Sequence, residues 1–133
     1  MLERDYIMRL LREFAEALEL LLKKDVRKQR EEIQKMYDQY VGPYAFYHTA
    51  PMSEVMDSFT HFPPEQRLKR MEMLAELYYA EASMSLGPTR HEMYRRAYAL
   101  YDMVTRHDKT YDLTRLTKMQ TAKQNMADEA VQP

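Results

Sequence analysis

Apolar side chains recur at steps of three and four residues along nearly the whole chain, from Glu3 to Met126. These steps keep the apolar residues on one face of an α-helix, whereas a half-buried strand would need strict alternation. The first segment, residues 3–23, shows the pattern most clearly, at Ile7, Leu10, Leu11, Phe14, Leu18 and Leu21. The pattern predicts an all-α fold without a sheet, in which Phe14 is buried.

Glycine and proline mark the ends of the predicted helices. The only two glycines, Gly42 and Gly87, each precede a proline. Glycine accepts the positive φ that ends a helix, and proline cannot continue one. The pair at 63–64 ends one helix and opens the next. Five to six helices are predicted, and the segments are about 3–23, 26–41, 51–62, 64–86, 89–107 and 113–126.

The inward faces of these helices differ in width. The second helix should bury Val26, Ile33, Met36, Tyr37 and Tyr40, and the last has only a thin stripe of Leu113, Leu116, Met119 and Met126. The helix at 64–86 has two apolar stripes, one with Leu68, Met71, Ala75, Tyr78 and Ala82, the other with Met73, Leu77, Ala80 and Met84. A helix with two apolar faces is packed on two sides, so Leu77 should be buried and this helix should lie in the middle of a stack.

Short helices joined by short loops are typical of stacked helical hairpins. The helices at 64–86 and 89–107 resemble one tetratricopeptide-like unit, with Leu77 and Ala80 on the first helix and Tyr94-Arg95-Arg96-Ala97 on the second. Three further pieces are Glu3-Arg4-Asp5-Tyr6-Ile7-Met8-Arg9, Leu74-Ala75-Glu76-Leu77 and Thr110-Tyr111-Asp112-Leu113-Thr114-Arg115. Their order is similar to that of an uncharacterised bacterial protein family with a tetratricopeptide-like helical fold. The resemblance implies stacked antiparallel helical hairpins and no established activity.

The sequence offers little material for catalysis or metal binding. It has no cysteine, which excludes disulfides, cysteine-based zinc sites and thiol chemistry. None of the four histidines has another four residues away, and no Glu-x-x-His occurs, so the helical zinc and di-iron patterns are missing. We therefore predict no catalytic residue, no metal and no cofactor, and a protein that is not an enzyme. The alternative is a small ligand-binding or enzymatic domain that uses polar groups of the helix at 64–86, such as Glu72, Glu76 and Glu81.

The charge balance bears on the class of partner. Twenty basic and 21 acidic residues give a net charge of −1, without the basic excess that is usual for binding duplex nucleic acid. Residues 23–30 nevertheless hold five cations, which leaves the alternative of a peripheral nucleic-acid or anionic-membrane binder. The longest aliphatic run, Leu20 to Leu22, is far short of the ~20 residues of a membrane span. We expect a cytoplasmic protein with a single domain over residues 1–127 and a flexible tail at 128–133.

The leading hypothesis is a non-enzymatic module that binds a protein partner or a second copy of itself. The predicted loop at 42–50 carries an aromatic cluster, Tyr44, Phe46, Tyr47 and His48, which we predict to be the contact surface. Aromatic side chains on loops serve either as binding sites or as lids over a core. The alternative is that these rings fill the gap between the second and third helices.

Overall fold

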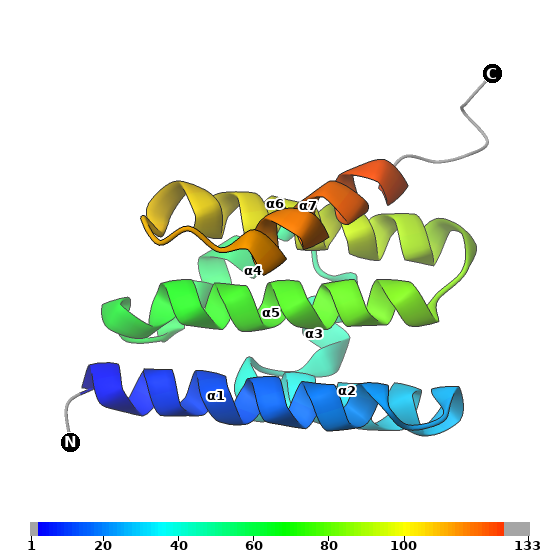
Figure 1. Ribbon diagram of the computed structural model, residues 1–133, viewed down its shortest axis with the longest axis horizontal. Coiled ribbons are helices and arrows are strands. Elements are labelled where there is room, and N and C mark those ends of the chain that lie inside the picture. Colours follow the sequence, from blue (N-terminus) through cyan, green and yellow to red (C-terminus); the bar gives the residue numbers. More distant parts are fainter. Residues whose placement is uncertain (1–2, 127–133) are drawn as a thin grey trace. The chain divides into compact units, whose positions relative to one another are not determined.

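The computed structural model describes residues 3–126, and these residues form helices and turns without a strand (Figure 1). The helices are α1 (Glu3–Leu22), α2 (Val26–Tyr40), α3 (Tyr44–Thr49), α4 (Met52–Ser58), the 3-10 turn η1 (Phe59–His61), α5 (Pro64–Met84), α6 (Gly87–His107) and α7 (Leu113–Asn125). The all-α fold is confirmed. None of the described helices is long and apolar enough to cross a membrane.

The chain falls into two compact units, Met1–Met73 and Leu74–Pro133, and the boundary lies inside α5. The single domain over 1–127 and the tetratricopeptide-like arrangement stay predictions, and the tail at 128–133 lies outside the described residues.

In the first unit, α1 and α2 form a hairpin. The Asp25 carboxylate caps α2 by accepting a hydrogen bond from the Lys28 backbone N–H at 3.1 Å. Phe14 is buried, as predicted, and meets the Tyr40 ring edge-on with 5.1 Å between centroids. The prediction that Val26 is buried is wrong: Val26 stands at the first position of α2 and is exposed.

The prediction of a loop over residues 42–50 is also wrong, because Tyr44–Thr49 form the helix α3. Its first backbone N–H, on Tyr44, donates to the Asp38 carboxylate at 3.0 Å, so α2 supplies the group that starts the helix. A helix of six residues is too short to show a repeating apolar pattern, and it has no side-chain cap of its own.

Both predicted apolar stripes of α5 are largely buried. Leu77 on one stripe and Tyr78 on the other are fully enclosed, which confirms the prediction for Leu77. Two polar residues that separate the stripes in the sequence, Arg70 and Glu81, are buried as well. Only a narrow part of the α5 surface therefore reaches solvent.

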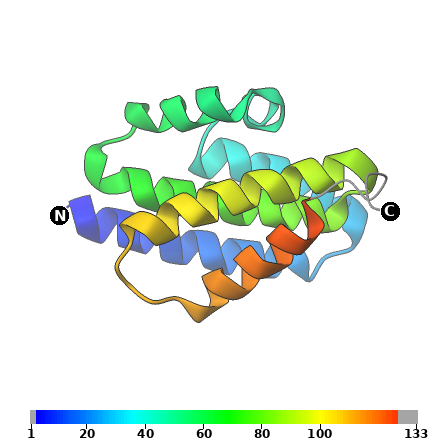
Figure 2. The same cartoon turned by 90° about the horizontal axis from the view of Figure 1, so that it is seen from above.

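In the second unit, α7 lies alongside α6 (Figure 2). One face of α6 is buried, and it includes Tyr94, Leu100 and Val104. The inward stripe predicted for α7 is wrong at its first position: Leu113 is exposed, and the buried residues of α7 are Arg115 and Ala122. The reason is that an arginine with strong local acceptors occupies the inward position at the start of this helix.

Candidate interaction surface

The aromatic cluster predicted as the contact surface lies on α3, and the structure brings its four members together. Tyr44 stacks on His48 with 5.1 Å between ring centroids, and its hydroxyl is hydrogen-bonded to His48 Nδ1 at 3.2 Å. Phe46 meets the Tyr47 ring edge-on at 4.9 Å. The rings also pack on α2, because Tyr37 meets Tyr44 edge-on at 5.0 Å.

Tyr47 is the buried anchor of this cluster. Its hydroxyl donates to Ser58 Oγ at 2.9 Å, since the Ser58 hydroxyl proton is already donated to the Val55 carbonyl at 2.6 Å. Its ring lies against Gly42, where an added Cβ would come within 2.9 Å of the ring. These contacts favour the alternative of a lid over the core, and they leave Tyr44, Phe46 and His48 half-buried. The role of the cluster in partner binding stays a prediction.

The basic segment 23–30 spans the turn between α1 and α2 and is almost entirely exposed. Two of its lysines face carboxylates: Lys24 binds Glu32 at 2.6 Å and Lys23 lies 3.8 Å from Glu19. A shallow depression on the turn is lined by Lys24, Asp25, Lys28, Glu31, Glu32 and Lys35. Three cations and three carboxylates balance in this depression, while Arg27 and Arg30 of the same segment are exposed as well. The alternative of a phosphate-binding segment stays a prediction.

Three buried arginines organise the two units, and the sequence pattern did not identify them. In the first unit, the Arg70 guanidinium donates to the Tyr40 carbonyl at 2.6 Å and to Gln66 Oε1 at 3.0 Å, and it lies over the Phe62 ring. Burial lowers the pKa of Arg70, and the nearby Tyr6 hydroxyl opposes this shift. Because Tyr40 ends α2, the cation meets the negative end of that helix dipole and satisfies one of its free carbonyls.

In the second unit, Arg96 joins α6 to α5. It donates to Glu92 at 3.0 Å and to the Tyr78 hydroxyl at 3.3 Å. Burial acts to lower the pKa of Arg96, but the hydrogen bonds with Tyr78 and Glu92 outweigh it and raise the pKa. The Arg96 side chain is therefore charged, and its hydrogen bonds hold α6 against α5.

Arg115 holds the connection between α6 and α7. Its guanidinium donates to Thr105 Oγ1 at 3.1 Å, Asp108 Oδ2 at 3.2 Å and the Thr110 carbonyl at 3.2 Å. The connection is also fixed locally, because the Asp112 carboxylate caps α7 at the Arg115 backbone N–H at 3.0 Å. The closing motif of the sequence, residues 110–115, thus forms the end of this braced connection and the first turn of α7.

The other end of α7 is tied to α6 as well. His91 Nδ1 donates to the Asn125 carbonyl at 2.7 Å, and Arg95 donates to the Met126 carbonyl at 3.1 Å. These bonds satisfy carbonyls at the end of α7 that have no partner within the helix. With Arg115 at its start, α7 is held at both ends.

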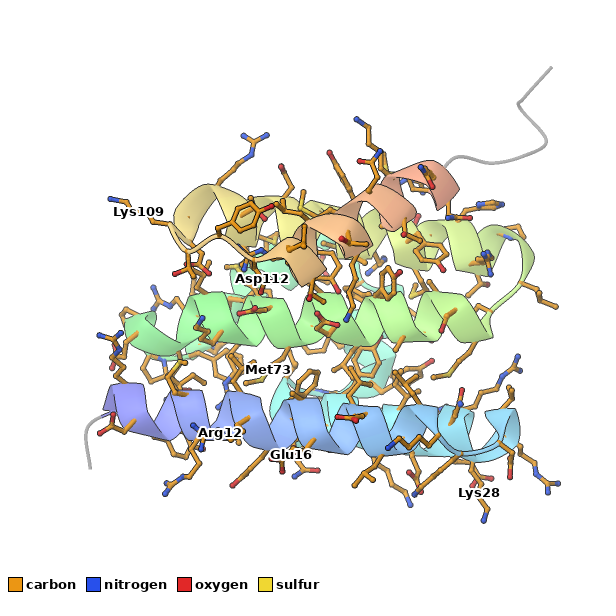
Figure 3. All side chains as sticks on the ribbon, in the orientation of Figure 1. Arg12, Glu16, Lys28, Met73, Lys109 and Asp112 are labelled. Carbon is orange, nitrogen blue, oxygen red and sulfur yellow. The ribbon has the colours of Figure 1, made fainter. Side chains whose placement is uncertain are left out.

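Two large apolar side chains project from the braced connection. Tyr111 is 75% exposed and Leu113 is 64% exposed, on either side of the capping Asp112, which Figure 3 labels together with Lys109. Exposed apolar residues are common on protein surfaces, but here the backbone beneath them is fixed by a buried cation and a helix cap. The sequence pattern assigned Leu113 to the core, so this surface could not be found from periodicity.

From Leu113 onward, the outward side of α7 has one exposed charged residue, Lys123. We call the uncharged residues beside it the α7 face: Leu113, Thr114, Thr117, Gln120, Thr121 and Gln124. The hydroxyls of Thr117 and Thr121 donate back to carbonyls of their own helix, at 2.9 and 3.3 Å. Because these hydroxyl protons already have acceptors, burying the two threonine side chains costs less free energy than burying unpaired hydroxyls.

Polar groups of α5, the basis of the enzymatic alternative, are engaged in packing. Glu76 binds Lys118 of α7 at 2.5 Å, and Lys118 also lies over the Tyr79 ring. Glu72 lies 3.6 Å from Lys69, and Glu81 is buried. Within residues 3–126, no group of three or more histidine or acidic side chains is placed to hold a metal ion.

No family model, no curated protein and no solved structure was found to match this chain.

Proposed function

We propose that this chain is a non-enzymatic protein-binding module, located in the cytoplasm, whose contact surface is the α6–α7 connection together with the α7 face. The observation that carries the proposal is the exposure of Tyr111 and Leu113 on a backbone braced by the buried Arg115.

Three physical arguments support this surface. Tyrosine is enriched among the residues that dominate binding energy, because it offers a large, stiff contact area with one polar end. A fixed backbone lowers the entropy cost of binding. The centres of protein interfaces are depleted in charge, and among the exposed residues of α7 only Lys123, at the edge of the α7 face, is charged.

The test is partner recovery with matched variants of the full chain. Leu113→Ser and Tyr111→Ser should abolish recovery of a specific partner from the native cell while the melting temperature stays unchanged, because neither side chain is part of the core. Leu86→Ser is the control, since Leu86 is 83% exposed at the turn between α5 and α6, outside the proposed surface. Recovery that survives both substitutions, or that Leu86→Ser abolishes equally, would contradict the proposal.

The cluster on α3 is a second candidate because Tyr44, Phe46 and His48 remain partly accessible. Tyr44→Ser and Tyr47→Ser separate the two roles. Lost stability with the partner retained would make α3 a lid, whereas unchanged stability with the partner lost would make it the site. The buried Tyr47 hydrogen bond favours the first result.

A further inference from the structure

We infer that the turn between α1 and α2 is a peripheral membrane-binding site, which places exposed aliphatic side chains in the surface of a bilayer that contains anionic lipids. The site is residues 20–30, which we call the hairpin tip. It lies in the first unit, whereas the proposed contact surface on α7 lies in the second. The inference therefore goes beyond the proposed function and does not rest on it.

The first support is the exposure of aliphatic side chains at the hairpin tip. Leu20, Leu22 and Val26 are all exposed, although the neighbouring Leu21 is buried in the core. Leu22 ends α1 and Val26 begins α2, so both lie where the hairpin turns (Figure 1). Exposed aliphatic side chains of this kind enter the boundary between the headgroups and the acyl chains of a bilayer.

The second support is the positive charge around these side chains. Five cations and one carboxylate lie within residues 20–30. Lys24 is paired with Glu32 at 2.6 Å, but Arg27 and Lys28 are exposed, and Figure 3 shows Lys28 projecting from α2. Lysine and arginine beside exposed aliphatic residues are attracted to anionic lipid headgroups.

The nearby carboxylates do not cancel this charge. Asp25 accepts a hydrogen bond from the Lys28 backbone N–H at 3.1 Å, and it stands at the positive end of the α2 dipole. Glu19 lies 3.8 Å from Lys23, and both side chains are exposed, so water already screens this pair. The two glutamates at 31–32 begin about 8 Å along α2 from its first residue. The charge next to the turn itself is therefore positive.

The third support is that backbone groups at the turn already have partners. The Gln29 side-chain amide donates to the Leu22 carbonyl at 3.1 Å and to the Lys24 carbonyl at 2.7 Å, at the end of α1. Asp25 caps the start of α2. Helix ends otherwise leave polar groups that must stay hydrated, which opposes entry into a bilayer. These contacts lower the free energy needed to move the turn into the headgroup region.

The aliphatic residues favour a bilayer over nucleic acid, which also carries phosphates. Proteins that bind single strands stack the bases on aromatic side chains, and residues 20–30 contain no aromatic residue. Charge distinguishes the hairpin tip from the exposed pair Tyr111 and Leu113, which stands beside one cation and one carboxylate, Lys109 and Asp112. That pair has no excess of positive charge to draw it to anionic lipids.

The experiment is sedimentation of the full chain with vesicles of phosphatidylcholine alone or of equal parts phosphatidylcholine and phosphatidylglycerol. The chain should bind the anionic vesicles and not the neutral ones, and salt should weaken the binding by screening the charges. Lys28→Gln should weaken it about fivefold, the effect of one basic residue near an anionic surface. Lys123→Gln removes the same charge from an exposed position of α7 and should leave binding unchanged.

A second pair of variants tests the aliphatic residues. Leu20→Ser should weaken binding to the anionic vesicles about tenfold, because the leucine side chain no longer leaves water on insertion. Leu113→Ser is the matched control, since Leu20 and Leu113 are 62% and 64% exposed, and it should bind the vesicles normally. Both side chains lie outside the core, so neither substitution should change the melting temperature.

A tryptophan at the hairpin tip reports insertion directly, because the chain has none of its own. The fluorescence of Leu22→Trp should shift to shorter wavelength when anionic vesicles are added, as the indole leaves water. The fluorescence of Leu113→Trp should not shift.

An absence of binding to the anionic vesicles, or equal binding to the neutral ones, would overturn the inference. Binding that Lys28→Gln weakens and Leu20→Ser leaves intact would also overturn it. The segment would then recognise phosphates without insertion, and duplex DNA would be bound in the same way. Leu20→Ser should leave partner recovery unchanged, so the inference and the proposed function can fail separately.

Discussion

Replacing Arg115 by alanine should lower the free energy of unfolding by about 3–5 kcal/mol, the usual cost of removing one partner from a buried ion pair. The side chains of Arg115 and Asp108 are only 4% and 16% exposed, and the guanidinium also serves Thr105 and the Thr110 carbonyl. Alanine removes the Arg115 charge from beside the Asp108 carboxylate and removes the donor from two further acceptors, Thr105 Oγ1 and the Thr110 carbonyl. Arg115→Lys should lower the free energy of unfolding by less than Arg115→Ala, because lysine keeps the positive charge. It should still be destabilising, because an ammonium group cannot reach all three acceptors as the planar guanidinium does.

A second arginine of the same unit provides the control. Arg106 binds Asp102 at 2.9 Å, a shorter distance, but its side chain is 72% exposed. Water and salt screen such a pair, so Arg106→Ala should cost only about 0–1 kcal/mol. Urea unfolding followed by circular dichroism compares the two. An equal cost for Arg115→Ala and Arg106→Ala would refute the account of a braced turn, since burial is what distinguishes the two pairs.

Three further predictions concern the core, a turn and pH. Phe14→Ala should lower the free energy of unfolding in urea by about 3–5 kcal/mol, because Phe14 is buried. Leu22 is 46% exposed, so Leu22→Ala should lower it by less than about 1 kcal/mol. Similar losses for the two variants would place Phe14 outside the core. Gly87 has a φ of 62° and open space where a Cβ would stand, so an added side chain would meet backbone strain and no clash. Gly87→Ala should lower the melting temperature through strain of about 1–2 kcal/mol, and Gly87→Asn should lower it less. An unchanged melting temperature for Gly87→Ala would show that the turn carries no such strain. Burial raises the pKa of Tyr94 and of Tyr40 above 10.0, so their un-ionised forms favour the folded state and this contribution is lost as pH rises through the raised values. The free energy of unfolding should therefore begin to fall as the pH rises past about 10, and a decline that Tyr94→Phe does not reduce would argue against this cause.

The extent to which the fold was predictable follows from the range over which each signal acts. Apolar spacing and the Gly-Pro and Pro-Pro pairs act within a few residues, and they located six of the seven α-helices formed by residues 3–126. The missing helix, α3, has six residues and starts on a carboxylate from α2. Its start depends on a contact with another helix, which spacing within the segment does not reveal.

The candidate surface was predictable only in part, for a similar reason. Arg70 and the Tyr40 carbonyl lie 30 residues apart in the chain, so the sequence pattern shows an arginine on a helix and not a cap for a distant helix end. Leu113 fits an apolar stripe by its spacing, but Arg115 takes the inward position because its acceptors, Thr105, Asp108 and the Thr110 carbonyl, are already placed there. A signal was present in the closing motif, where an aspartate that can cap α7 stands three residues before an arginine.

The position of the unit boundary within α5 affects how this protein can be divided. A cut between Met73 and Leu74 would split a helix of 21 residues into two pieces of about ten, and isolated helices shorter than about 12–15 residues are marginal in water. Each fragment would end in a segment that cannot hold its own shape. The formation of one half of α5 therefore favours the other half, and the chain should fold cooperatively across the boundary instead of as two separable pieces.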